Sequence, residues 1–440
     1  MRVLAVGGGG REHAIVKALV KGGAEVYAVM KNRNPGIARA AKDFKLMKET
    51  DLDKVTQFAV DSGVELAVIG PEAPLEVGLV DRLAEKGIGC VGPTKSAARI
   101  ETSKRFAREL LRRHHVPGNI RFAAFDDFEA ARRYIQDLDH EVAVKPTGLT
   151  GGKGVKVQGE HLKDIPAVLA YVKEIFEKGI GGAGVVLEER LQGEEVTLQA
   201  FCDGRTVIPM PVVQDHKRAF EGDVGPNTGG MGSYSMQDHM LPFMTKNEHE
   251  KAVESMKGTV EAMRKEGCPY QGILYGQFML TSTGPRIIEF NARFGDPEAM
   301  NVLPILDSNF VDICHKISSG TLASAQCSFM RKATVCKYVV PEGYGLEPKA
   351  NLPISVDEQG VKRTGAELFY AAVNEEGRHI LTSTSRAMAL VGIDADIDEA
   401  ERMCEAALEY VKGEAIYVRH DIGRREIIQK KIARMNALRK

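Results

Sequence analysis

The architecture of this chain is best predicted from one stretch, Ile288-Glu289-Phe290-Asn291-Ala292-Arg293-Phe294-Gly295-Asp296-Pro297-Glu298. Residues 286–290 have the composition of a strand, and side chains on a strand alternate between its two faces. Glu289 and Asn291 therefore point the same way. A carboxylate beside an amide oxygen suits a hard cation such as Mg²⁺. With Arg293 close behind and a turn that carries two further acids, the stretch indicates chemistry on a phosphate. An edge strand with solvated polar residues is the alternative.

Composition narrows the classes of function. A chain of 440 residues predicts about three domains at ~100–200 residues each. The net charge of −1 provides no field that would attract nucleic acid or an anionic membrane, and no apolar run is long enough to span one. The seven cysteines form no C-x-x-C pair and are typical of reduced core residues. We expect a cytoplasmic protein, a monomer or weak dimer, whose partners are small molecules.

The order of apolar patterns predicts an α/β and α+β multidomain protein. Residues 1–101 alternate strands and helices, including one helix over 75–85, as in a doubly wound parallel sheet. Residues 102–121 and 188–326 form a strand-rich core, which a helix over 246–266 interrupts. Residues 122–187 form a small α+β unit with a helix over 165–178, and residues 327–440 form a C-terminal domain.

A first glycine cluster, Gly7–Gly10, follows the first predicted strand and opens a helix. Free backbone N–H groups at such a helix terminus bind anions. The cluster fails as a dinucleotide fingerprint, because the third required glycine is Glu12 or His13 and no acid follows the second strand. We favour a substrate phosphate over a generic turn. A second loop, 70–75, follows another strand at the sheet edge where ligands bind.

A second glycine cluster, 148–154, joins strand to strand and so cannot be a Walker A loop. Such a hairpin can fold over a triphosphate, with Lys145 and Lys104 as cationic partners. A surface hairpin with solvated lysines is the alternative. The acidic segment 187–195 then crosses between domains. As a hinge, this segment has backbone groups that suit an adenine edge and a glutamate that suits ribose hydroxyls. An ordinary acidic linker is the alternative, because such linkers are common.

Residues 214–232 are predicted to be a long polar loop, which in a compact domain is usually functional or disordered. Its composition of histidine, asparagine and glycine differs from that of disordered segments. His216 as a general base is one reading. A contact from His216 to phosphate or carboxylate is favoured, because no obvious carboxylate–histidine–nucleophile set is visible in the loop.

In this order, the motifs resemble the ATP-grasp superfamily and, within it, the phosphoribosylamine–glycine ligases. The resemblance covers essentially the whole chain. Its motifs are G-G-G-G-R-E-H-A at the start, G-P-E-x-P-L at 70–75, K-x-x-G-L-x-x-G-K-G-V at 145–155, Q-D-H-K-R at 214–218, G-P-N-T-G-G-M-G at 225–232 and I-E-F-N-x-R-F-G-D-P-E at 288–298. One departure is Pro146-Thr147-Gly148, where the family has Ala-Asp-Gly; Val224 is one added residue.

The resemblance implies an ATP-grasp fold, with residues 122–187 as its lid. It also implies a reaction in which ATP, glycine and 5-phosphoribosylamine give glycinamide ribonucleotide, ADP and phosphate through an acyl phosphate. ATP serves as co-substrate and Mg²⁺ or Mn²⁺ as cofactor. Another ATP-grasp ligase and a non-catalytic nucleotide sensor are the alternatives.

The resemblance also implies roles for individual residues. The metal ligands are Glu289, Asn291 and, less firmly, Gln277. The catalytic residues are Arg293, Lys145, His216 and Asp215. ATP is held by Lys104, Lys145, Gly151, Gly152, Lys153, Gly154, Glu188, Glu189, Arg190, Leu191 and Glu195. The substrates contact Gly8, Gly9, Gly10, Arg11, Glu12, Pro71, Glu72, Pro74, Leu75, Lys217, Gly229, Gly230, Asp296, Pro297 and Glu298. Asp296 and Glu298 are expected to orient Arg293 or to bind the substrate amine.

Overall fold

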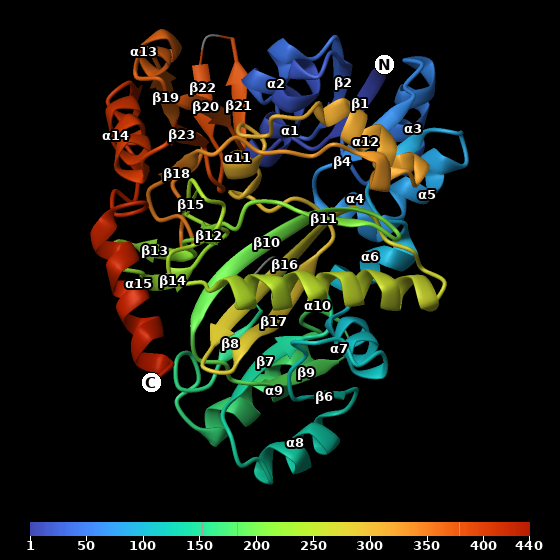
Figure 1. Cartoon of the computed structure of the whole chain (residues 1–440), viewed down its shortest axis with the longest axis vertical. Coiled ribbons are helices and arrows are strands. Elements are labelled where there is room, and N and C mark those ends of the chain that lie inside the picture. The colour runs from blue at the N-terminus through green and yellow to red at the C-terminus, as the bar shows by residue number, and fades with distance from the viewer. Residues whose placement is uncertain (151–153, 183, 378) are drawn as a thin grey trace.

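The computed structural model describes residues 1–150, 154–182, 184–377 and 379–440, and Figure 1 shows how its parts are layered. The N-terminal sheet has the order β3-β2-β1-β4-β5, and each neighbouring pair is parallel, as predicted. The order reverses between β1 and β4, which is where ligands bind in such sheets. The strands are β1 (Arg2–Val6), β2 (Glu25–Met30), β3 (Asp43–Leu46), β4 (Leu66–Ile69) and β5 (Gly89–Val91).

The helices of this part begin with α1, which starts directly after the first glycine cluster. The helix predicted over 75–85 is wrong as a single element, because Gly78 adopts φ 93° and separates two short helices. A left-handed residue cannot continue a helix. The helices are α1 (Gly10–Lys21), α2 (Pro35–Ala40), α3 (Leu52–Asp61), α4 (Glu72–Val77), α5 (Leu79–Ala84) and α6 (Lys95–Thr102).

The core of the molecule is an antiparallel sheet of order β11-β10-β16-β17. Helix α10 lies across it, and α7 packs beside β17. Ser103 caps α7 by accepting from the Phe106 N–H. The elements are β10 (Glu194–Asp203), β11 (Val207–Pro209), β16 (Gln271–Thr281), β17 (Gly284–Asn291), α7 (Lys104–Arg113), α10 (Lys246–Lys265), α11 (Ala299–Val302) and α12 (Phe310–Ser319).

The lid, residues 122–187, has its own sheet of order β6-β9-β7-β8 and its own apolar cluster. It forms the lower end of the molecule in Figure 1. Strand β6 and helix α8 were not predicted from the sequence. The elements are β6 (Phe122–Phe125), α8 (Phe128–Gln136), β7 (Val142–Pro146), β8 (Lys156–Val157), α9 (Ile165–Lys178) and β9 (Val185–Glu189).

The C-terminal part contains a sheet of order β12-β15-β18-β23-β20, with α14 packed on β18 and β23. Strand β12 and the first residue of β15 come from the segment 214–232, which was predicted to be a long polar loop, and a hairpin of β13 and β14 lies between these two strands. That prediction was therefore wrong. The elements are β12 (Gln214–Asp215), β13 (Arg218–Phe220), β14 (Val224–Asn227), β15 (Gly232–Ser235), β18 (Ala333–Pro341), β20 (Glu367–Tyr370), β23 (Met388–Asp394), α13 (Glu358–Arg363), α14 (Ile397–Leu408) and α15 (Arg425–Leu438).

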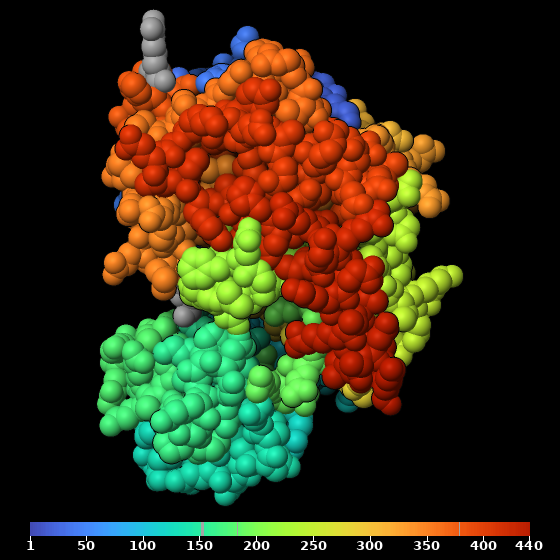
Figure 2. All heavy atoms as spheres, turned by 90° about the vertical axis from the view of Figure 1, so that its left-hand side faces the viewer, coloured from blue at the N-terminus to red at the C-terminus, as the bar shows by residue number. Residues whose placement is uncertain are grey.

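A second, smaller sheet of order β21-β22-β19-β24 completes this part. Its strands are β19 (Pro353–Val356), β21 (Val373–Glu376), β22 (His379–Thr382) and β24 (Val411–Lys412), and β25 (Ile416–Tyr417) pairs with β18. Figure 2 shows a hollow between the lid and the rest of the molecule. Within the described residues, none of the helices combines the length and the apolar character that a membrane crossing requires.

Candidate active site

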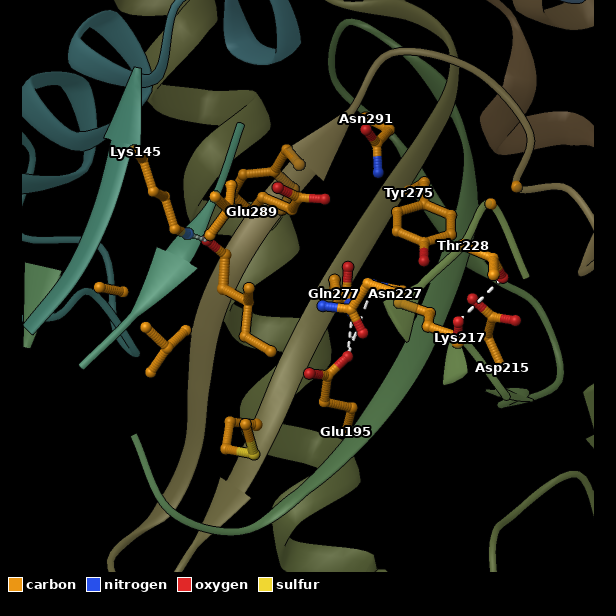
Figure 3. A pocket seen from close by; sticks show the side chains of 18 of the residues that line it. Lys145, Glu195, Asp215, Lys217, Asn227, Thr228, Tyr275, Gln277, Glu289 and Asn291 are labelled. Atoms are coloured by element: carbon orange, nitrogen blue, oxygen red, sulfur yellow. Dashed lines mark hydrogen bonds and ion pairs between the residues drawn. The ribbon is translucent and has the colours of Figure 1, made fainter. Parts of the chain in front are cut away.

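One cavity of about 1230 Å³ lies where the lid, the core sheet, the N-terminal part and the C-terminal part meet. Most residues predicted for the site line it, and Figure 3 shows its centre. They are Arg11, Glu72, Lys104, Lys145, Glu188, Glu189, Arg190, Leu191, Glu195, Asp215, His216, Lys217, Gly229, Gln277, Glu289, Asn291, Arg293, Asp296 and Glu298.

Several predicted residues do not line this cavity. Gly151, Gly152 and Lys153 lie outside the described residues. Leu75 is 1% exposed and packs in the hydrophobic core, so its side chain is not accessible to a substrate. The others that lie off the cavity wall are Gly8, Gly9, Gly10, Glu12, Pro71, Pro74, Gly154, Gly230 and Pro297.

Two neighbouring strands of the core sheet, β16 and the edge strand β17, bring the predicted metal ligands together. Gln277 of β16 pairs with Glu289 of β17, and Tyr275 pairs with Asn291, so both strands contribute to one patch (Figure 3). Within the described part of the chain, the Glu289 carboxylate makes no hydrogen bond or ion pair. Burial opposes its ionisation, yet the surrounding cations, Lys217 foremost, hold the pKa of Glu289 below its ordinary value. An anionic oxygen pair thus remains open to a cation.

Lys145 is anchored at the lid side of the cavity. Its Nζ lies 2.7 Å from Glu188 Oε2 and donates to the Ile288 carbonyl at 3.1 Å. Arg108 donates to the same carboxylate through Nε at 2.7 Å and Nη2 at 3.0 Å. Burial opposes ionisation of Glu188, but these two cations lower its pKa to about 2. The carboxylate of Glu188 is therefore occupied by protein groups. Of the predicted hinge contacts at this residue, only the backbone is left for an adenine.

Lys104 begins helix α7 on the same side of the cavity as Lys145, and its backbone N–H donates to the Thr147 carbonyl at 2.8 Å. Its Nζ donates to the Gly148 carbonyl at 2.9 Å, and burial lowers the pKa of its ammonium group. In the middle of the cavity, the Gln277 amide nitrogen donates to the Glu195 carboxylate. Lys217 Nζ lies 3.5 Å from Oε2 of the same carboxylate. Burial opposes the charge of Lys217, but the carboxylates of Glu195, Glu289 and Asp215 raise its pKa. Positive charge therefore flanks the cavity on both sides.

Asp215 and His216 lie on the C-terminal side of the cavity. Within the described residues, Asp215 Oδ1 is buried without a hydrogen-bond partner. Burial and the neighbouring Glu298 raise the pKa of Asp215 well above its ordinary value. His216 Nδ1 lies 3.0 Å from Asp223 Oδ1, so the structure contains the carboxylate–histidine pair that the sequence did not reveal. Asp223 sits at φ 57° in the β13–β14 turn, and Arg419 also contacts it at 2.9 Å.

Arg293 is held by two acids that sequence reasoning did not assign to it. Its Nη2 lies 3.1 Å from Glu101 Oε1, and its Nε lies 3.6 Å from Glu72 Oε2. The expectation that Asp296 or Glu298 orients Arg293 is wrong. Glu298 Oε1 accepts from Thr197 at 3.0 Å and from Tyr275 at 2.9 Å. Asp296 contacts residues of the C-terminal part, described below.

The first glycine cluster is closed by its own helix. Glu12 Oε2 accepts from the Gly9 N–H at 2.7 Å, and Glu12 Oε1 accepts from Arg11 Nε at 2.6 Å. A Cβ on Gly70 would stand 2.2 Å from Glu12 Oε1, so glycine is needed there. Arg11 Nη1 reaches the Phe294 carbonyl at 3.1 Å and places its guanidinium at the cavity wall. The Gly9 N–H of this loop is therefore already bonded to a carboxylate of the protein itself, that of Glu12.

The residues missed from the sequence share one property. Each acts through a partner far away in the chain, and no local motif marks it. They are Glu101, Arg108, Asp223 (through Arg419), Tyr275, Tyr338 and Arg386.

The core sheet, the antiparallel lid and the lysine-flanked cavity between them define an ATP-grasp protein. In agreement, a model described as the ATP-grasp (A) domain of phosphoribosylglycinamide synthetase matches residues 102–299. The models described as the N domain and the C domain of the same enzyme match residues 1–101 and 334–425. The chain therefore belongs to the phosphoribosylglycinamide synthetase family and is an ATP-grasp ligase.

Similar proteins support this assignment. The chain is 56% identical over 441 residues to the phosphoribosylamine–glycine ligase of Methanothermobacter thermautotrophicus, covering 100% of both chains. It matches the crystal structure of the phosphoribosylamine–glycine ligase of Thermotoga maritima with a TM-score of 0.81 at 28% identity, over 96% of this chain and 100% of that one. The biotin carboxylase domain of Hydrogenobacter thermophilus 2-oxoglutarate carboxylase, solved with MgADP and bicarbonate, matches at 17% identity with a TM-score of 0.71, over 99% of this chain and 93% of that one. This last likeness shows the fold alone.

Proposed function

We propose that this chain ligates glycine to 5-phosphoribosylamine with ATP, through a glycyl phosphate, giving glycinamide ribonucleotide, ADP and phosphate in purine biosynthesis. The observation that carries the proposal is a single cavity. The lysines, the Glu289 carboxylate and the buried Asp215 line it in the order in which the reaction would use them. Two anions, a triphosphate and a carboxylate, must meet. Fixed cations offset their repulsion, and positioning supplies most of the catalysis.

At the ATP end, Lys104 and Lys145 contact phosphate oxygens. Lys145 is held by Glu188 at 2.7 Å, so its ammonium group is directed before ATP arrives. The backbone of residues 188–191 meets the adenine, while Glu195, whose carboxylate borders the cavity, meets the ribose. The predicted closure by Gly151–Gly154 remains a prediction. Residues 122–187 act as the lid over this end, and residues 1–101 and 327–440 complete the substrate end.

A divalent cation, Mg²⁺ or Mn²⁺, would be held by Glu289, Asn291 and Gln277. The donors fit it. Glu289 has no protein partner in the described part of the chain, and Gln277 donates through its amide nitrogen, which leaves the amide oxygen available. No group of three or more His, Cys, Asp or Glu side chains suited to a metal occurs among the described residues, but Mg²⁺ uses few carboxylates when phosphates complete its shell. When bound, the ion supplies charge that polarises phosphoryl oxygens.

The first chemical step joins a glycine carboxylate oxygen to the γ-phosphorus, and ADP leaves. Arg293 stabilises the charge on the transferring phosphoryl group, and Glu101 holds its guanidinium at 3.1 Å. Lys217 holds the glycine carboxylate. The unpartnered Oδ1 of Asp215 accepts from the glycine ammonium group, which places glycine beside the Gly229–Gly230 turn. His216, held by Asp223 at 3.0 Å, supports this wall of the site.

In the second step the amine of 5-phosphoribosylamine attacks the glycyl carbonyl carbon. The C–N bond forms, the C–O bond to phosphate breaks, and the amine gives up a proton. Arg11 and Glu72 stand on the cavity wall nearest the N-terminal sheet and contact this substrate. The loops Gly8–Gly10 and Pro71–Leu75 contribute backbone, and Glu12 holds them in place by accepting from the Gly9 N–H. Glu298 and Asp296 lie towards the amine.

The remaining parts of the proposal concern the setting of the reaction. All seven cysteines are free and six are buried, which suits a reducing, cytoplasmic compartment. The chain works as a monomer or weak dimer on small molecules. A formate or bicarbonate ligase is disfavoured by the glycine-type loops at 214–218 and 225–232. A non-catalytic sensor is disfavoured because Glu289, Asn291 and Arg293 are all retained at the cavity.

The experiment that tests the proposal measures ADP release with glycine and freshly generated 5-phosphoribosylamine. Release that needs both substrates is expected. Release with another carboxylate, in the absence of release with glycine, would assign a different ligase. ATP binding without turnover of any carboxylate would assign the sensor.

A further inference from the structure

Arg386, which precedes strand β23, lines the cavity from the C-terminal part. Its side chain is 13% exposed. Nη1 donates to the carbonyls of Gly229 at 2.5 Å, Gly230 at 3.3 Å and Asp296 at 2.8 Å. Nη2 lies 3.1 Å from the Asp296 carboxylate. One guanidinium therefore joins two segments that are remote from it in sequence.

Tyr338 of β18 completes the arrangement. Its hydroxyl donates to Asp296 Oδ1 at 2.5 Å, and the Arg386 guanidinium carbon lies 4.6 Å from the centre of its ring. Both carboxylate oxygens of Asp296 are thus occupied by protein groups. Asp296 then has a lower capacity to bind a substrate amine directly, and its place in the site is set from the C-terminal part.

The turn that Arg386 holds packs directly against the proposed glycine contact. Gly230 has φ 106°, and a Cβ there would stand 2.7 Å from Asp215 Oδ1 and 2.8 Å from Pro297 Cδ. Three carbonyl oxygens converge on the guanidinium, and without a cation they would face one another unpaired. A polar group that loses its partner is destabilising unless water replaces that partner, so the turn would move, and Asp215 Oδ1 would lose the neighbour that fixes it.

We propose that Arg386 is the positioning residue of the glycine subsite. It acts through the Gly229–Gly230 turn and Asp296, with which both of its Nη atoms interact. The inference rests on the proposed function, because that function places glycine at Asp215. It predicts that residues 327–440, which supply no predicted glycine contact, nevertheless set the affinity for glycine.

The test compares Arg386→Ala with the wild-type enzyme in the ADP-release assay, with each of the three substrates varied in turn. We expect the KM for glycine to rise at least about tenfold and kcat to fall, while the KM values for ATP and 5-phosphoribosylamine change less than about twofold. Added guanidinium ion should restore part of the glycine affinity, whereas a merely structural role would not give that rescue. Arg402→Ala is the matched control, because Arg402 is an exposed arginine of the same part that pairs only with Glu399 on its own helix.

Tyr338→Phe provides a second variant that removes a single hydroxyl group and preserves the packing of the ring. It should raise the KM for glycine by about threefold. The inference is overturned if all three KM values move together, if only the KM for 5-phosphoribosylamine rises, or if both variants keep the wild-type glycine KM. A wild-type enzyme that releases no ADP with glycine would instead overturn the proposed function. In that case, ATP binding is compared between Arg386→Ala and the wild-type enzyme. Unchanged ATP binding would show that the variant is folded, which separates a positioning role from general misfolding.

Discussion

Replacing Glu188 by glutamine removes the charge that two buried cations share. Glu188, Arg108 and Lys145 are 3%, 3% and 4% exposed. Arg108 also donates through Nη2 to the carbonyls of Ile287 at 2.9 Å and Ile288 at 2.8 Å, so the same group steadies strand β17. The variant should therefore loosen the lid-to-core junction as well as the ATP-contacting lysine.

The magnitude follows from the pKa of Glu188, which falls from 4.5 to about 2. At about 1.4 kcal/mol for each pH unit, this difference corresponds to about 3 kcal/mol of stabilisation. Removing one partner of a buried ion pair typically costs about 3–5 kcal/mol, which agrees. Because the folded-state pKa is depressed, the stabilisation is complete above pH 4.5 and is lost as the pH falls towards 2.

The assay is amide hydrogen exchange in strands β7 and β9 at neutral pH, because a chain of several domains does not unfold in one step. We expect the local free energy of opening to fall by about 3 kcal/mol in Glu188→Gln, together with a rise in the KM for ATP. Glu141→Gln is the control, since Glu141 pairs with Arg190 at the lid surface and should cost less than about 1 kcal/mol. A change below about 1 kcal/mol in Glu188→Gln, or equal changes in both variants, would refute the reasoning.

Three further outcomes are expected. Glu289→Gln should lower turnover at saturating ATP at least about 100-fold, and a rate that is unchanged across Mg²⁺ concentrations would contradict the metal assignment. Arg293→Lys keeps the charge but cannot span both Glu101 and Glu72, so kcat should fall about 100-fold; retention of full kcat would remove Arg293 from the phosphoryl step. Asp223→Asn keeps a residue that tolerates φ 57° but removes the charge that faces Arg419 and His216, and should lower the thermal midpoint by about 5 °C, against no change in Asp126→Asn, an exposed control.

Local patterns were sufficient for much of the fold. Helix α9 was predicted at its observed bounds, because apolar periodicity and caps act over neighbouring residues. The segment 214–232 was misjudged because its strands are only two to four residues long and form by pairing with β18 and with each other. The break at Gly78 was missed because a glycine within a helical pattern does not by itself reveal its φ.

The sequence by itself determined which residue types carry the chemistry. The glutamate and asparagine of β17, the two lysines and the glycine loops stand in local order, and alternation on a strand was sufficient to place Glu289 beside Asn291. Only the tertiary structure decided which charges neutralise one another. Arg293 pairs with Glu101, 192 positions away, and Arg386 reaches the Asp296 carbonyl 90 positions away. Such pairs depend on how separate sheets pack, and the ion pairs at a cavity follow from that packing rather than from any periodicity along the chain.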